Sequence, residues 1–263
     1  MEVATLALGK RLELIAAEYL RTRYSGPGNP MGARILHAAP LTVTRVAYVP
    51  QNSQMNGAHG VESVEDFRRV CEFYEDQSFW IDVTPSVSPK LLATLGPSGF
   101  RPESFTSVLH ASPIPKPIEH AIAVEVIARR DLDVFLDTIN VGFGVSEDVL
   151  DVLSANQSFW SDVPNWRLLL ARVVGEPAGA AVLAISGKSA YLAAAATLPR
   201  FRGTGVHTAL IAERLKLAKA AGCSEVTGQA DAGSTSQCNQ QRAGLGIVHT
   251  KCIWTNTPLS GQM

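Results

Sequence analysis

The spacing of apolar residues predicts alternating strands and helices through the second half of the chain. Residues 121–128 form an apolar run typical of a strand, whereas 132–144 and 146–160 have apolar residues at helical spacing, with Ser146 as a candidate N-cap. The other elements expected here are strands over 166–174 and 180–186 joined by a turn at 175–179, strands over 191–197 and 224–231, a last strand pair around 247–254, and helices over 206–221 and after Gly233.

The first half repeats the later part of this order. Its expected elements are helices over 6–23, after Gly60 and over 90–95, and strands over 43–49, 79–85 and 105–111. Gly60-Val61 and Gly99-Phe100 are 39 positions apart, and so are Gly205-Val206 and Gly244-Leu245. A single offset of 145 therefore superposes the two halves, which predicts a duplicated module.

A proline-rich segment separates the two halves. Residues 112–117 read Ser-Pro-Ile-Pro-Lys-Pro, which breaks helices and β-ladders and favours an extended linker. We therefore expect one module over 1–111, a linker over 112–117 and a second module over 118–263.

Composition and charge narrow the range of functions. With 263 residues, 46% of them hydrophobic and 18% charged, the chain has the composition of a folded protein. The net charge of −1, without blocks of like charge, disfavours a dedicated binder of nucleic acid or of anionic membranes. Charged residues interrupt the first 24 positions, so neither a signal peptide nor a spanning helix is expected, and the predicted location is the cytoplasm.

The metal-binding residue types show no ligand spacing. The six histidines form no HExxH pattern, and the cysteines include no close pair: Cys71, Cys223, Cys238 and Cys252. No metal cofactor is expected.

The segment 197–210 carries the most informative chemistry. It reads Thr-Leu-Pro-Arg-Phe-Arg-Gly-Thr-Gly-Val-His-Thr-Ala-Leu and places a glycine-rich loop between a strand and a helix. Such a loop presents backbone N–H groups at the positive end of the helix dipole, where phosphate oxygens bind. An arginine beside it adds a charge-assisted hydrogen bond.

This segment resembles the phosphate-binding motif of the GNAT superfamily of N-acyltransferases, Arg/Gln-x-x-Gly-x-Gly/Ala. Two registers fit: Arg200-x-x-Gly203-x-Gly205 matches every letter, whereas Arg202-x-x-Gly205-x-His207 keeps the family's proline three residues before the arginine and its small residue–Leu pair in the helix. We prefer the second register, in which His207 replaces Gly or Ala.

The resemblance extends over most of 120–255. The turn at 175–179 is similar to a family hairpin, and 233–245 is similar to the family's helix leading to Gly-Phe. The resemblance implies a mixed α/β fold of tandem GNAT-like modules, each a splayed mixed sheet flanked by helices. It also implies an N-acyltransferase in which the acceptor amine attacks a thioester directly. For this chain, the simplest such reaction is acetyl transfer from acetyl-CoA to a small-molecule amine.

The family's donor-binding positions carry over only to the second module. With the offset of 145, Arg202 and His207 of the second module correspond to Gly57 and Glu62 of the first. The first module therefore lacks the arginine and has a carboxylate at the helix start. We expect it to serve as a scaffold and as a wall of the acceptor cleft. The resemblance implies CoA contacts at Ala195, Ala196, Thr197, Arg202, Gly203, Thr204, Gly205, Val206, His207, Thr208, Ser236 and Asn239.

The acid–base residues do not carry over. The family often has a tyrosine four residues before the late glycine, where this chain has Gln240, and the usual strand glutamate is absent. The candidates near the expected split between strands are Asp231, Cys238 and His249. Aromatic residues in the helix–loop segment that lines the acceptor pocket in this family are Phe143, Phe159, Trp160 and Trp166.

Two alternative functions remain open at this stage. Some GNAT-like proteins with tandem modules take an acyl group from aminoacyl-tRNA, and a local basic face is available for this: Arg200, Arg202, Arg214, Lys216 and Lys219. The missing tyrosine and glutamate favour instead a sensor that binds acyl-CoA without catalysis. Thiol release in the presence of amines separates an enzyme from a sensor.

Overall fold

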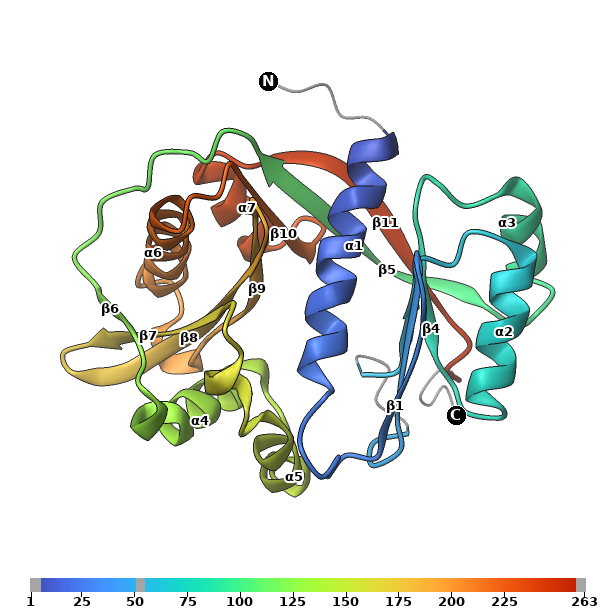
Figure 1. Ribbon diagram of the computed structural model, residues 1–263, viewed down its shortest axis with the longest axis horizontal. Coiled ribbons are helices and arrows are strands. Elements are labelled where there is room, and N and C mark those ends of the chain that lie inside the picture. Colours follow the sequence, from blue (N-terminus) through green and yellow to red (C-terminus); the bar gives the residue numbers. More distant parts are fainter. Residues whose placement is uncertain (1–5, 51–54, 259–263) are drawn as a thin grey trace.

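In a computed structural model, which describes residues 6–50 and 55–258, the first half of the chain begins with the long helix predicted at 6–23 (Figure 1). Two short strands, at 33–38 and 57–59, are additional to the predicted elements. The half consists of α1 Leu6–Arg23, β1 Ala33–Ala38, β2 Leu41–Val46, β3 Gly57–His59, α2 Val64–Tyr74, β4 Trp80–Val83, α3 Pro89–Leu95 and β5 Arg101–Ala111.

The second half follows the predicted order closely. Ser146 stands at the N-cap position of its second helix, although its hydroxyl makes no capping hydrogen bond. The half consists of β6 Ala123–Val126, α4 Leu132–Phe143, α5 Glu147–Gln157, β7 Trp166–Val173, β8 Glu176–Ser186, β9 Ser189–Thr197, α6 Val206–Ala220, β10 Glu225–Asp231, α7 Thr235–Arg242 and β11 Gly246–Thr255, with single 3-10 turns at 129–131, 160–162 and 199–201.

Both halves contribute to one continuous mixed sheet. Its strand order within the described residues is β1-β2-β3-β4-β11-β5-β10-β9-β8-β7-β6. Strand β5 of the first half lies between β10 and β11, and β11 of the second half lies between β4 and β5 (Figure 1). Each half therefore completes its part of the sheet with a strand from the other.

The pairing of β5 with β11 agrees with the offset of 145. Gly246 pairs with His110 and Thr255 with Arg101, and the offset carries Arg101 onto Gly246 and His110 onto Thr255. The two strands therefore correspond to each other, and a local two-fold axis passes between them. The predicted strand pair around 247–254 is wrong, because the chain forms there the single strand β11, whose partners β4 and β5 come from the first half.

The hairpin between β7 and β8 is tighter than predicted. Val173 pairs with Glu176, so the turn consists of Val174 and Gly175, which have φ angles of 51° and 81°. Two consecutive positive φ angles are typical of a type I′ turn, whose twist matches that of the strands. Residues 176–179 of the predicted turn therefore belong to β8.

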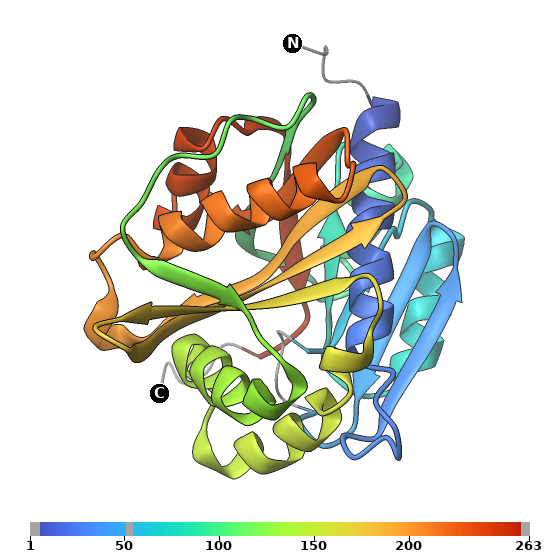
Figure 2. The ribbon, with the colours of Figure 1, turned by 60° about the vertical axis from the view of Figure 1, so that its left-hand side comes forward.

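Helices cover the two faces of the second half's sheet with separate cores. Alternate residues of β7, β8 and β9 point to opposite faces of the sheet. One face packs against α6 in a core that includes Leu169, Ala181 and Leu210. The other face packs against α4 and α1 in a core that includes Leu170, Val182 and Phe135. Figure 2 shows α6 on one side of these strands and α4 and α5 on the other. None of the helices in the described part of the chain is long and apolar enough to cross a lipid bilayer.

Candidate functional site

The strands β9 and β10 diverge halfway along their length. They pair in parallel from Ser189 opposite Glu225 to Leu192 opposite Gly228, and no pairing between them continues beyond this point. Residues 193–197 of β9 therefore have a backbone edge that β10 does not cover. Such an edge suits an extended ligand arm that adds to the sheet like a strand.

A β-bulge lies at the point of divergence. Ala195 pairs with Ala181 and Leu192 with Leu183, so Ala193 and Ala194 of β9 together oppose one residue of β8. The buried guanidinium of Arg214 on α6 donates hydrogen bonds to the backbone oxygens of Ala193 and Val182, at 3.2 and 3.4 Å. Arg214 therefore holds the bulge in place, and burial lowers its pKa to about 9.

The loop before α6 ends in a helix start that has no side-chain cap. Gly205 is the N-cap residue, with a φ of 91° that favours glycine, and the first turn contains no acidic residue. Residues 202–205 are exposed. Backbone N–H groups at such a start lack an intrahelical acceptor and attract anions.

The two arginines of the loop have different partners. Arg200 forms an ion pair with Glu176 at 2.9 Å, and its guanidinium lies over the Phe201 ring. Arg202 instead donates a hydrogen bond of 3.3 Å to the backbone oxygen of Gly142 at the end of α4. Within the described residues, Arg202 has no carboxylate partner, so its charge is available to a ligand, as the preferred register requires.

His207 is held as a neutral imidazole between α6 and α7. Arg242 donates to Oδ1 of Asn239 at 2.8 Å, so Nδ2 of Asn239 donates to Nδ1 of His207 at 3.1 Å. The ring proton of His207 is thereby placed on Nε2. Burial, with a smaller effect of Arg214, lowers the pKa of His207 to about 4. Asn239 thus orients His207.

The remaining predicted CoA contacts lie on both sides of the divergence. Ala195, Ala196 and Thr197 are in β9, and the hydroxyl of Thr197 is buried without a hydrogen-bond partner. Ser236 lies in the first turn of α7, whose N-cap is Ser234, with its hydroxyl accepting from the amide of Gln237. Gln240 has a buried Oε1 without a partner, and a Cβ on Gly228 would lie 2.3 Å from it.

The three predicted acid–base residues lie on separate elements. Asp231 is the exposed last residue of β10, and Cys238 lies within α7. His249 lies on β11, two strands away from β10, and its Nε2 is 2.9 Å from Oε1 of Glu13 on α1. The structure does not bring these three side chains together.

Tyr19 on α1 lies beside the bulge, a position that the sequence did not indicate. Its ring contacts Tyr191 and Trp166, with centroids 5.6 and 4.9 Å apart. Its hydroxyl is buried beside the backbone of Ala194 in the bulge and has no hydrogen-bond partner within 3.5 Å in the part of the chain that the structure describes. Burial raises the pKa of Tyr19, so the hydroxyl is an uncharged donor at neutral pH. An isolated tyrosine in an amphipathic helix, 175 positions before Ala194, gives no signal of this role in the sequence.

A cavity of about 490 Å³, the α4–α5 cavity, adjoins the bulge at Ala194. Of the predicted acceptor residues, Phe143 and Trp160 line it, whereas Trp166 packs against Tyr19 and Phe159 packs beside the core under α4. Its described lining residues are Arg23, Met55, Ile139, Asn140, Phe143, Gly144, Val145, Ser146, Val149, Leu153, Gln157, Trp160 and Ala194.

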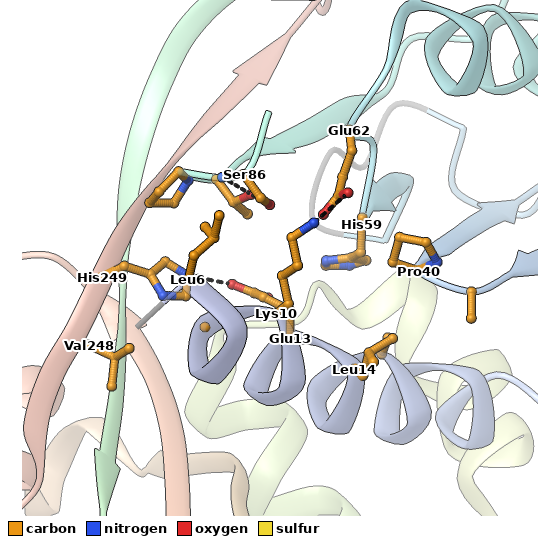
Figure 3. Close-up of a pocket in the computed structure, with 16 residues that line it drawn as sticks. Leu6, Lys10, Glu13, Leu14, Pro40, His59, Glu62, Ser86, Val248 and His249 are labelled. Carbon is orange, nitrogen blue, oxygen red and sulfur yellow. Dashed lines mark hydrogen bonds and ion pairs between the residues drawn. The ribbon is translucent and has the colours of Figure 1, made fainter. Parts of the chain in front are cut away.

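A second cavity, of about 550 Å³, lies between α1 and the first half of the sheet. Figure 3 shows Lys10 directed at Glu62 and Glu13 directed at His249 across it. Among the residues predicted to bind CoA, none lines this cavity. In the described ranges, no three His, Cys, Asp or Glu side chains are arranged to hold a metal ion.

The corresponding helix start in the first half is closed. Ser63 caps α2 and forms a capping box with Asp66, and Glu65 adds a second carboxylate in the first turn. This helix begins three residues later than the offset of 145 predicts, and Gly57 lies in β3 opposite Trp80 rather than in the loop. The alignment of Gly57 and Glu62 with Arg202 and His207 is therefore wrong. Counted from the helix starts, the residues in those places are Gly60 and Glu65, which again offer no cation to a phosphate.

The comparisons with known proteins agree with this geometry. Residues 138–238 match the model of the acetyltransferase (GNAT) family, a range that contains the second half of α4, the bulge, the uncapped start of α6 and the first half of α7. The chain carries a GNAT acetyltransferase domain. No curated protein matches the chain.

Solved structures extend the GNAT fold to the whole chain. A GCN5-related N-acetyltransferase from Kribbella flavida is 19% identical, with a TM-score of 0.61, over 93% of this chain and 96% of that one. One from Sphaerobacter thermophilus is 16% identical, with a TM-score of 0.61, over 96% and 94%. A tandem GNAT protein from the clavulanic acid biosynthesis pathway is 12% identical, with a TM-score of 0.58, over 98% of each chain. The predicted mixed α/β fold of tandem GNAT-like modules is thus confirmed. At these identities, the likeness shows the fold alone.

Proposed function

We propose that the chain is an N-acyltransferase that moves an acetyl group from acetyl-CoA to the amine of a small molecule, with one donor site in its second half. The proposal rests on the uncapped, acid-free start of α6 beside the uncovered edge of β9. These features suit the two parts of the donor: the pyrophosphate at the helix start and the pantetheine arm along the strand.

In this proposal, the residues of the chain orient the reactants rather than form a covalent intermediate. Acetyl-CoA supplies a thioester that an amine can attack; a C–N bond forms, the C–S bond breaks, the amine loses a proton and the thiolate gains one. The bulge at Ala193 and Ala194 turns backbone groups toward the reacting carbonyl. Tyr19, uncharged and buried beside Ala194, is the proposed hydrogen-bond donor there.

Thiol release tests the reaction. We expect the protein, incubated with acetyl-CoA and a panel of small-molecule amines, to release free thiol above the enzyme-free rate for at least one amine. Calorimetry is expected to give one CoA site per chain. Gly205→Asp is expected to abolish both, because aspartate is strained at this φ and opposes phosphate with a negative charge. Tight CoA binding with no thiol release for any amine would favour the sensor function, and two CoA per chain would contradict a closed first-half site.

The two loop arginines are expected to differ in their effect on CoA affinity. Arg202→Ala should weaken CoA binding by about 1.5–3 kcal/mol, the range for hydrogen bonds to charged groups. Arg200→Ala should weaken it less, because Arg200 is already paired with Glu176 on the surface. Calorimetric dissociation constants of the two variants provide the measurement. An equal or larger loss at Arg200 would show that the register Arg200-x-x-Gly203-x-Gly205 is the correct one.

The aminoacyl-tRNA alternative receives less support from the basic residues considered for it. Arg214 is buried under the sheet, Arg200 is paired with Glu176, and Lys216 is paired with Glu213. The exposed positive charge on this face is therefore smaller than the sequence indicates. A steep salt dependence of binding to charged tRNA would restore this alternative.

A further inference from the structure

The α4–α5 cavity has an unusual charge pattern for a space next to a catalytic strand. Its described lining contains one charged side chain, Arg23, at the end of α1, and no carboxylate. The lining also includes Ala194 of the bulge. A molecule in this cavity would therefore meet both a cation and the proposed reaction centre.

Two hydrogen-bond donors in the cavity wall have no acceptor. Nε of Arg23 and Nε1 of Trp160 are both buried and have no hydrogen-bond partner among residues 6–50 and 55–258, and Trp160 is only 1% exposed. The neighbouring amides do not serve as acceptors for them, because Asn140 and Gln157 bond to each other in both directions, at 2.8 and 3.2 Å. A buried donor without a partner costs about 1–3 kcal/mol, so a ligand that supplies acceptors would gain from both.

Arg23 has no counter-ion among the described residues. Its guanidinium lies over the face of the Tyr24 ring, 5.4 Å from the ring centroid. A guanidinium presents Nε and one terminal nitrogen as a planar pair of donors, which matches the two oxygens of a carboxylate. A single cation balances one negative charge, whereas a phosphate monoester carries nearly two at neutral pH.

We propose that the α4–α5 cavity binds a carboxylate of the acceptor through Arg23 and Trp160, so that the acceptor is an amine that also carries a carboxylate, as amino acids do. The inference rests on the proposed acyl transfer and narrows its substrate class. The carboxylate binds at Arg23, and the amine is directed toward Ala194. Arg23 and Trp160 are thus specificity-determining residues supplied from two distant parts of the chain.

Matched pairs of substrates test the proposal. Thiol release is measured with amino acids and with the corresponding amino-acid amides, which keep the amine and lose the carboxylate. In Arg23→Gln, KM for the acids is expected to rise by about tenfold or more, as expected for loss of a charged hydrogen bond, with little change for the amides. Arg23→Lys should retain part of the preference, and Trp160→Phe should show a smaller rise. Arg21→Gln, on the same helix but outside the cavity lining, is the control.

Direct binding separates this inference from the proposed reaction. The panel of N-acetylated amino acids, which represent products, is titrated into the wild-type protein and followed by its thermal transition and by calorimetry. Binding that Arg23→Gln abolishes and Arg21→Gln retains supports the carboxylate site even if no amine releases thiol, in which case the reaction alone fails. A wild-type preference for amides over acids, absence of binding by every acid, or equal effects of Arg23→Gln on acids and amides would overturn the inference.

Discussion

A chain that begins at residue 118 is expected to lose both solubility and acyl transfer. Without β4 and β5, strand β11 loses both of its partners and β10 loses one, so three edges of unpaired backbone groups face water. The same truncation removes α1, which covers the sheet around Tyr191 and carries Tyr19 and Arg23. The loss affects the central strands rather than a peripheral domain.

The measurement is the soluble yield of residues 118–263, followed by size-exclusion chromatography and thiol release. The matched control is the same fragment expressed together with residues 1–117 as a separate chain. Because β5 pairs with β10 and β11 without a covalent link, we expect the two fragments to form a soluble complex with recovered activity. A soluble, monomeric and active 118–263 fragment would show that the second half closes its own sheet.

The order of the elements could be predicted from the sequence because it depends on local patterns. The amphipathic spacing of 6–23 gives α1, and the apolar residues of 206–220 give α6. The pairing of β5 with β10 and β11 could not be predicted, because apolar alternation identifies a strand but not its partner. The module boundaries 1–111, 112–117 and 118–263 remain a prediction about how the sequence is divided. In the structure, a single sheet contains strands of both halves.

The candidate site divides in the same way. The glycine loop could be found because a phosphate site at a helix start depends on adjacent residues. Tyr19 and Arg23 could not, since they reach the site through the packing of α1 against β9. Arg214 could be noticed in the sequence as a charged residue on the apolar face of a helix. The structure explains it by the hydrogen bond that Arg214 donates at the bulge.

The contact between the two halves includes a buried chain of charges. Nζ of Lys251 on β11 lies 2.9 Å from Glu13 on α1 and 2.7 Å from Asp82 on β4. His59 and His249 extend the chain at its two ends, with imidazole nitrogens 2.6 Å from Asp82 and 2.9 Å from Glu13. Lys251 is 2% exposed, so its charge is balanced within the protein rather than by water. A buried ion pair of this kind links elements by making the loss of either partner costly.

The pKa shifts of the two carboxyl groups set the pH range in which the cluster stabilises the fold. Although burial opposes it, Lys251 and the hydrogen-bonded histidines lower the pKa of Asp82 and of Glu13. A carboxyl group with a lowered pKa in the folded state contributes stability above its unfolded pKa of about 4 and loses it as the pH falls further. The contribution of Lys251 is therefore expected in full at neutral pH.

Lys251→Met is expected to destabilise the protein by about 3–5 kcal/mol, the range for removing one partner of a buried ion pair. The substitution keeps most of the side-chain volume but leaves Glu13 and Asp82 as two buried carboxylates without their shared cation. Chemical denaturation at pH 7 measures the loss, and Lys216→Met, at an exposed pair with Glu213, is the control, with an expected change below about 1 kcal/mol. The difference between wild type and Lys251→Met should shrink below pH 4, because protonated carboxyl groups no longer need the cation. A loss that stays constant between pH 7 and pH 3 would show that Lys251 acts through packing rather than through its charge.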